Sequence, residues 1–245
     1  MATRYNYTGG IVTNGLVLNL DAAKTDSYPG SGTLWRDLSG NGNNGTLTNG
    51  PTFSGIGKQA SIVFDGVNDY VDCGNNTTLN LNSSFTLNCW FKVSNSAPST
   101  NDGKGLIAKY TGVTANRSYM LFFTGSTNTI SFIISSDGTN TASTLKSISY
   151  SSISRETWYN LTGVFTASQK LEMFLNGTLV SSDTTTLNQV FSSSTQPLTI
   201  GAQAISIPGF YFLGTIASTQ IYNRALSASE VLQNFNALKG RYGIA

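Results

Sequence analysis

The chain has 245 residues, of which only 11% are charged, and its net charge at pH 7 is +2. Its Lys and Arg residues are scattered, whereas nucleic acids and anionic membrane surfaces are bound by clustered cations. The composition therefore argues against both partners. The length favours one large domain that can bury a substantial core.

Histidine is absent, and there are only two cysteines, Cys73 and Cys89. Without histidine the chain has no Ser-His-Asp or Cys-His catalysis and no His-ligated zinc. The cysteines form no Cys-x-x-Cys pattern, and a cytoplasmic origin disfavours oxidation. This favours two buried free thiols over a single disulfide.

The first fourteen residues, MATRYNYTGGIVTN, carry one charge and no apolar run of signal-peptide length. No later apolar run is long enough to span a bilayer. We therefore expect synthesis in the cytoplasm without a signal peptide, and no membrane partner. Residues 1–14 are interpreted as an arm whose Tyr5 and Tyr7 suit a partner interface, with a frayed end or an extra edge strand as the alternative.

An oxygen-rich stretch lies between residues 37 and 48. Five of its residues occupy positions one, three, five, six and seven of an EF-hand-like calcium loop. They are Asp37, Ser39, Asn41, Gly42 and Asn43. Position twelve is Thr48 instead of the bidentate glutamate. Two interpretations follow: a weak calcium site at Asp37, Asn41 and Asn43, or a turn bonded to its own Asx side chains, which the missing glutamate favours.

Alternation of apolar and polar residues dominates the chain. Phe85, Leu87 and Cys89 alternate with polar neighbours, which is the period of a strand with one buried face. The same pattern predicts strands at 16–21, 60–65, 85–93, 117–124, 129–135, 157–166, 170–175, 197–201 and 212–222. Asp137-Gly138 and Asn176-Gly177 supply the positive φ angles of tight hairpin turns. We therefore predict an all-β, two-sheet antiparallel sandwich or jelly roll.

One short helix is predicted near the C-terminus. Ser227 and Glu230 form a capping box. After it, four apolar residues fall on one helical face. They are Val231, Leu232, Phe235 and Leu238. We expect this helix to lie on the sandwich.

Four phrases in fixed order resemble the laminin G-like, concanavalin A-like superfamily. They are GLVLNLDAAKTDSYPGSGTLWRDLSGNGNNGTL, SIVFDGVNDYVDCGNNTTLNLNSSFTLNCWFKV, RETWYNLTGVFTASQKLEMFLNGTLV and FLGTIASTQIYNRALSASEVLQNFNALKGRYG. The resemblance implies that residues 15–245 form one curved, two-sheet jelly roll. Relatives often place an acidic residue after the Gly-Thr-Ile of the last strand to assist calcium. This chain has Ala217 and Ser218 there, which counts against calcium.

The opening phrase also resembles the domain variant found in structural proteins of tailed bacteriophages. Those virion proteins are made without signal peptides. The resemblance therefore implies a virion location and virion proteins as partners.

Catalysis has a direct test in this superfamily, because its glucan-cleaving members carry Glu-x-Asp-x-Glu along one strand. The only glutamates here are Glu156, Glu172 and Glu230. The last belongs to the helix cap, and the other two have no carboxylate two or four residues away. The sequence therefore predicts that the chain is not an enzyme.

Aromatic side chains are the remaining candidates for ligand binding. Trp90 lies opposite the apolar stripe of its strand, so it either borders the sheet on which relatives bind sugars or packs within the fold. Phe210 and Tyr211 follow a Pro-Gly turn and could stack on a sugar or a partner protein, with core packing as the alternative.

The leading prediction is a non-enzymatic virion structural protein, a capsid decoration or fibre-type module with a lectin-like fold. The alternative is a carbohydrate-binding lectin module for attachment to a host surface. The two are compatible if the decoration itself holds cell-surface glycans, and either allows a homo-oligomer. No cofactor is expected other than the calcium considered above.

Overall fold

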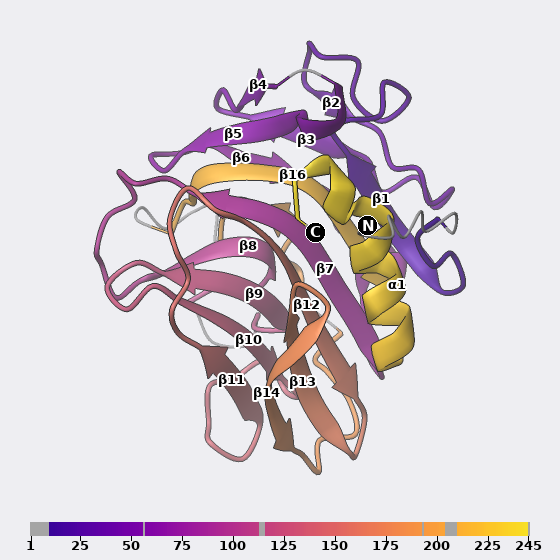
Figure 1. Ribbon diagram of the computed structural model, residues 1–245. Helices are drawn as coiled ribbons and strands as arrows, with labels where there is room; N and C mark the ends of the chain where they lie inside the picture. Colours follow the sequence, from indigo (N-terminus) through magenta and orange to yellow (C-terminus); the bar gives the residue numbers. More distant parts are fainter. Residues whose placement is uncertain (1–9, 56, 113–115, 193, 204–209, 245) are drawn as a thin grey trace, which may run out of the picture.

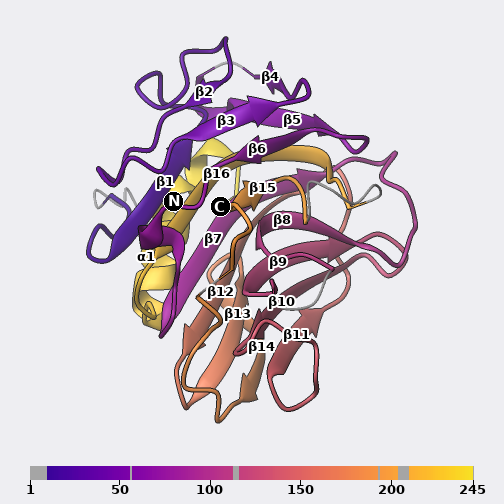
Figure 2. The same ribbon diagram turned by 180° about the vertical axis from the view of Figure 1, so that it is seen from behind.

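The computed structural model describes residues 10–55, 57–112, 116–192, 194–203 and 210–244, which form two antiparallel sheets (Figures 1 and 2). Sheet A contains β1 (Leu16–Asp21), β4 (Thr52–Ser54), β5 (Ser61–Asp65), β7 (Phe85–Val93), β12 (Trp158–Thr166), β13 (Lys170–Leu175), β14 (Thr178–Thr184) and β16 (Leu213–Tyr222). Its order is β14-β13-β12-β7-β16-β5-β4, and β1 also pairs with β16.

Sheet B contains β2 (Leu34–Trp35), β3 (Gly45–Thr48), β6 (Tyr70–Asp72), β8 (Gly103–Lys109), β9 (Tyr119–Thr124), β10 (Thr129–Ser135), β11 (Leu145–Tyr150) and β15 (Thr199–Ile200). Its order is β11-β10-β9-β8-β15-β6-β3-β2. One α-helix, α1 (Ala228–Leu238), and three short 3-10 helices at Gly57–Gln59, Thr77–Leu79 and Lys239–Arg241 complete the described elements.

The core lies between the inner faces of the two sheets. Phe85 of β7 contacts three rings, with centroid distances of 5.2 Å to Tyr119, 5.9 Å to Phe132 and 5.7 Å to Phe165. Such tilted and edge-to-face pairs add packing energy beyond area burial. The all-β sandwich with one short C-terminal helix is thus confirmed.

Both cysteines are free thiols buried in this core, as the sequence predicted. Burial raises the pKa of both the Cys73 and the Cys89 thiol. Neither thiol is therefore a reactive thiolate at neutral pH.

All nine predicted strands are found within two residues of their expected bounds, whereas several others, including β11 and β14, were not predicted. Strand β8 is also one of these. Its sequence, GKGLIAK, begins with two glycines that interrupt the alternation. Both glycines are needed for close packing. A Cβ on Gly103 would lie 2.7 Å from the Phe122 ring, and one on Gly105 would lie 2.4 Å from the Ala202 backbone. Local patterning cannot anticipate such long-range contacts.

Helix α1 begins with the predicted capping box: the Ser227 hydroxyl accepts from the Glu230 amide, and the Glu230 carboxylate accepts from the Ser227 amide. The helix lies on the outer face of sheet A (Figure 1). No helix among the described residues has the length and apolar character needed to cross a membrane.

Residues 10–14 of the segment interpreted as an arm pack against the sandwich. The Val12 amide donates to Asn234 Oδ1 at 2.8 Å, and the Tyr222 hydroxyl donates to the Val12 carbonyl at 2.9 Å. Val12 itself is buried. Residues 1–9, which include Tyr5 and Tyr7, lie outside the described residues.

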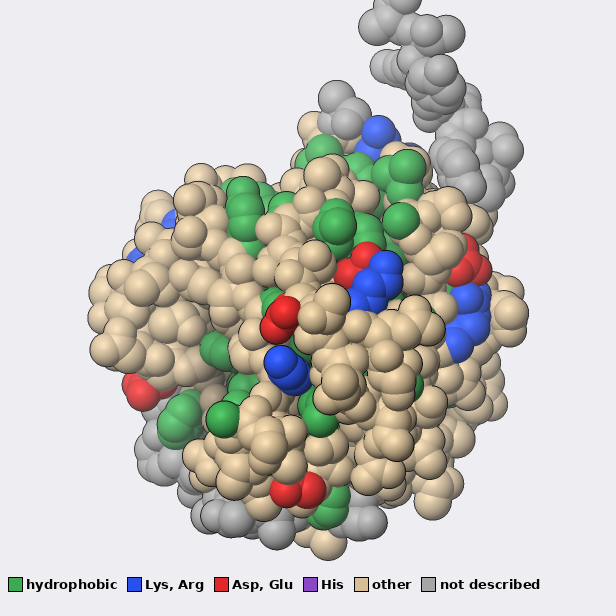
Figure 3. Space-filling view, turned by 90° about the horizontal axis from the view of Figure 1, so that it is seen from below, with side chains coloured by type: hydrophobic (Ala, Val, Ile, Leu, Met, Phe, Trp, Pro, Cys, Tyr) green, Lys and Arg blue, Asp and Glu red, His purple; other side chains and the backbone are tan. Residues whose placement is uncertain are grey.

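The surface reflects the low charge content of the chain. In the space-filling view, neutral polar groups cover most of the face, and charged and hydrophobic side chains are scattered over it (Figure 3). Among the described residues the large exposed hydrophobic side chains are Leu34, Val67, Leu179 and Leu232.

Candidate functional site

The outer faces of the two sheets differ in how they are covered. On sheet A, Phe235 and Leu238 of α1 pack with Trp90 of β7 and Ala217 of β16. The described part of the chain places no α-helix on the outer face of sheet B (Figure 2).

Trp90 packs within the fold, which is one of the two alternatives considered from the sequence. Its side chain is 0% exposed. The indole is stacked against Phe235, at 5.7 Å between ring centroids, and against Tyr242, at 4.2 Å. Because the residue is fully buried, no sugar can stack on it.

The oxygen-rich loop is bonded to itself. Asp37 Oδ1 accepts from the amides of Asn19 and Ser39, and Oδ2 accepts from the Ser39 hydroxyl and the Asn43 amide. Asn41 donates to the Leu16 carbonyl. Both oxygens of the Asp37 carboxylate thus accept hydrogen bonds from the protein itself, as expected for a turn that is bonded to its own Asx side chain.

The side chain of Asn43 is also hydrogen-bonded within the fold, because its amide nitrogen Nδ2 donates to the Val17 carbonyl and to the Thr78 hydroxyl. The geometry therefore supports the turn and gives no support to calcium at Asp37, Asn41 and Asn43. Across the described residues, no group of three or more His, Cys, Asp or Glu side chains could hold a metal ion.

A groove of about 370 Å³ opens on sheet B, where β3 and β6 pair. Leu47 and Val71 face the core, so the alternate residues Thr46, Thr48 and Asp72 point to the outer face. The groove is lined by Asn44, Thr46, Thr48, Asp72, Cys73 and Gly74. We call it the sheet B groove.

The sheet B groove presents free hydrogen-bonding groups. Asp72 Oδ1 accepts from the Gly74 amide at 2.7 Å, and Asn44 Oδ1 accepts from the Asp37 amide at 2.9 Å. Asp72 Oδ2, the Asn44 amide nitrogen and the Thr46 hydroxyl have no partner among the described residues. A ligand could therefore find both donors and acceptors here.

The sheet B groove carries negative charge. Asp72 is the one charged side chain in its described lining. Beneath it, burial first and then the nearby carboxylates of Asp72 and Asp37 raise the pKa of the Cys73 thiol. An anion would meet repulsion here.

Phe210 and Tyr211 do not line the sheet B groove. Tyr211 is buried and forms a bridge with Ala202, and burial, followed by the neighbouring Tyr70, raises the pKa of its hydroxyl. Phe210 is half-buried and accepts at its carbonyl from the Gln203 amide at 3.1 Å. Core packing, the alternative considered from the sequence, fits Tyr211.

Sequence reasoning did not single out Asn44 or Thr46 as ligand-binding residues. The available signal was the alternation in Gly45-Thr46-Leu47-Thr48, which places two hydroxyls on one strand face. It could not show that Asp72 pairs with Thr46.

The chain is similar to known proteins in sequence pattern and in fold. A family model described as the concanavalin A-like lectin/glucanases superfamily matches residues 65–232. No curated protein sequence matches the chain.

Among solved structures, the chain is similar to the binding domain of Paraclostridial mosquitocidal protein 1, with a TM-score of 0.71 and 18% identity over 95% of this chain and 56% of that one. It is also similar to the binding domain of botulinum neurotoxin DC in complex with SialylT (TM-score 0.66, 15% identity, 93% and 52% covered). The same toxin domain in complex with rat synaptotagmin II gives a TM-score of 0.63 and 16% identity, with 93% and 52% covered. The chain spans about half the length of these structures, and such identities establish a shared fold alone.

Proposed function

The chain belongs to the concanavalin A-like lectin/glucanases superfamily, and from this premise we propose that it is a non-catalytic recognition module that binds neutral carbohydrate in the sheet B groove. The observation that carries the proposal is the groove itself, with its free carboxylate oxygen, amide and hydroxyl. Sugar hydroxyls both donate and accept, so they match such a mixed set of groups.

The charge of the groove supports neutral sugars over acidic ones. Asp72 would face a ligand, and no Lys or Arg occurs in the described lining. A sialic acid or uronic acid carboxylate would therefore be placed beside a like charge. In this respect the proposed ligand differs from the SialylT that the botulinum neurotoxin DC domain holds.

The arrangement of carboxylates supports binding without catalysis. Glycoside hydrolysis uses two carboxyl groups on either side of the scissile bond. Asp72 is the one carboxylate in the described lining of the groove. The three glutamates are engaged elsewhere: Glu156 lies 3.4 Å from Lys92, Glu172 lies 2.8 Å from Lys170, and Glu230 caps α1.

A glycan array with the parent chain and three variants tests the proposal. We expect neutral oligosaccharides to bind and sialylated ones not to bind. Asp72→Ala and Thr46→Val should each weaken binding about tenfold, because each removes a hydrogen bond to the ligand. Asp183→Ala, which removes an exposed carboxylate of β14, is the matched control and should bind like the parent.

The proposal is wrong if no neutral glycan binds, if only sialylated glycans bind, or if Asp72→Ala binds as well as the parent. Thermal unfolding of each variant shows whether a loss of binding reflects a loss of fold.

A second proposal concerns where the module acts, namely on a virion as a decoration or fibre-type component. It is supported by the resemblance of the opening phrase, which includes SYPGSG at residues 27–32, to the domain variant of tailed-phage structural proteins. Immunogold labelling of purified particles from the source tests this, and we expect label at regular positions on the particle. Unlabelled particles would contradict the virion location and leave the glycan proposal standing.

A further inference from the structure

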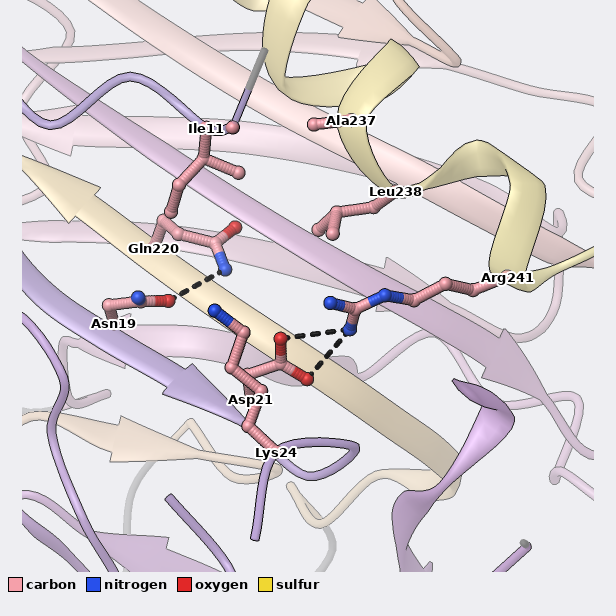
Figure 4. A pocket seen from close by; sticks show the side chains of 9 residues that line it. Ile11, Asn19, Asp21, Lys24, Gln220, Ala237, Leu238 and Arg241 are labelled. Atoms are coloured by element: carbon pink, nitrogen blue, oxygen red, sulfur yellow. Dashed lines mark hydrogen bonds and ion pairs between the residues drawn. The ribbon is translucent and has the colours of Figure 1, made fainter. Parts of the chain in front are cut away.

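A second hollow, of about 140 Å³, lies between β1, β16 and the end of α1 (Figure 4). One wall is apolar, formed by Ile11 and by Ala237 and Leu238 of α1. The opposite wall is polar, and Asn19 and Gln220 lie side by side on it because β1 pairs with β16 at these residues. We call it the helix-end pocket.

Gln220 presents a buried acceptor without a donor. Its residue is 1% exposed, and its amide nitrogen donates to Asn19 Oδ1 at 3.2 Å. Its Oε1 atom is buried and has no hydrogen-bond partner. Figure 4 shows this oxygen turned away from Asn19 into the space bounded by Ile11 and Leu238. A buried acceptor is unfavourable unless a donor reaches it, so the site is suited to a ligand that brings one.

The charged groups of the pocket leave a net positive charge. Arg241 Nη1 donates to both carboxylate oxygens of Asp21, at 2.9 and 2.8 Å, so these two charges balance. Lys24 also lines the pocket and forms no ion pair with a described residue. Its side chain runs beside the Asp21 carboxylate in Figure 4. The pocket therefore attracts an anion.

We propose that the helix-end pocket binds a small hydroxycarboxylate. The hydroxyl donates to Gln220 Oε1, the carboxylate pairs with the Lys24 ammonium, and the aliphatic carbons lie against Ile11 and Leu238. The size agrees, because a protein cavity of about 150 Å³ holds a ligand of about six heavy atoms, such as benzene. Lactate has that number of heavy atoms and carries all three features. This site is separate from the sheet B groove and does not depend on the glycan proposal.

Titrations followed by ¹H–¹⁵N NMR on the full chain test the site with three probes. We expect racemic lactate at millimolar concentrations to shift the NMR signals of the Gln220 side-chain amide and of the backbone amide of Gly10, which also lines the pocket, in a saturable way. Propionate lacks the hydroxyl and glycerol lacks the carboxylate, so both should bind at least tenfold more weakly.

Two variants connect the binding to the named groups. Lys24→Met replaces an exposed side chain, so it should fold like the parent and bind lactate at least tenfold more weakly. Lys146→Met removes a lysine of β11 and is the matched control, which should bind like the parent. The proposal is overturned if lactate causes no saturable shift, if propionate or glycerol binds equally well, or if Lys24→Met binds as tightly as Lys146→Met.

Discussion

At the scale of single residues, Lys109 is the most unusual charged group of the core. Its side chain is 0% exposed, and its ammonium donates to Asn75 Oδ1 and to the Gln196 carbonyl, at 2.7 Å for the latter. Both partners are uncharged. Burial therefore lowers the pKa of Lys109 from 10.5 to about 8. The charged Lys109 ammonium links the loop at Asn75 to the loop at Gln196. Its burial costs free energy, because a charge without an oppositely charged partner among the described residues is removed from water.

The lowered pKa makes stability depend on pH. Between pH 8 and 10.5 the unfolded chain still binds the Lys109 proton, which the folded chain has begun to release. The contribution of this residue to the free energy of unfolding therefore rises with pH across that window. It amounts to at most ~3 kcal/mol.

Lys109→Met should remove this pH dependence. We expect urea unfolding to show that the parent gains ~2 kcal/mol relative to the variant between about pH 7 and about pH 10. The comparison of parent and variant cancels the effect of the buried tyrosines, which titrate in both. A free-energy difference between the two that stays constant over this range would show that Lys109 is not held with a lowered pKa.

At the scale of elements, sheet A carries a row of buried amides on its outer face. Asn160 of β12 and Asn88 of β7 exchange two hydrogen bonds of 3.2 Å, and Gln220 of β16 donates to Asn19 of β1. All four residues are buried. Alternation in the sequence placed the polar neighbours of Phe85, Leu87 and Cys89 opposite the apolar stripe, and Asn88 is one of them. A polar residue that faces away from the core is nevertheless not always exposed to solvent. Its partners come from strands far away in the sequence.

The contact between residues 10–14 and α1 gives an element-scale prediction. Val12 is buried and takes part in two hydrogen bonds, to Asn234 and Tyr222. Deleting residues 2–14 should therefore lower the free energy of unfolding by about 3 kcal/mol relative to deleting residues 2–9. Denaturant unfolding of the two truncated chains provides the measurement. Equal stabilities would mean that the Val12 contacts contribute little.

The shorter deletion also examines the proposed arm. If residues 2–9, with Tyr5 and Tyr7, attach the domain to a particle, the chain lacking them should fold like the parent but fail to join the particle. Normal incorporation of that chain would assign docking to the sandwich surface.

At the scale of the whole molecule, the fold was more predictable than the sites. The period of two, the Asn176-Gly177 turn and the Ser227 cap are local patterns, and each is present in the structure. The sheet B groove needs residues near 46 and 72 to meet, and the helix-end pocket needs residues near 20, 220 and 241 to meet. Both sites are created by the pairing of strands that are distant in the sequence, and local sequence patterns do not predict which strands pair.

The place of β16 in sheet A has a consequence for how the protein is made. This strand is the last of the described strands, yet it lies in the middle of its sheet, where β1, β5 and β7 all pair with it along its length. A ribosome has to deliver more than two hundred residues before that strand emerges. Until then the earlier strands have open edges, which are prone to pair with other chains. Sheet A can therefore close only after β16 has been synthesised, and the nascent chain needs protection from its neighbours during that interval.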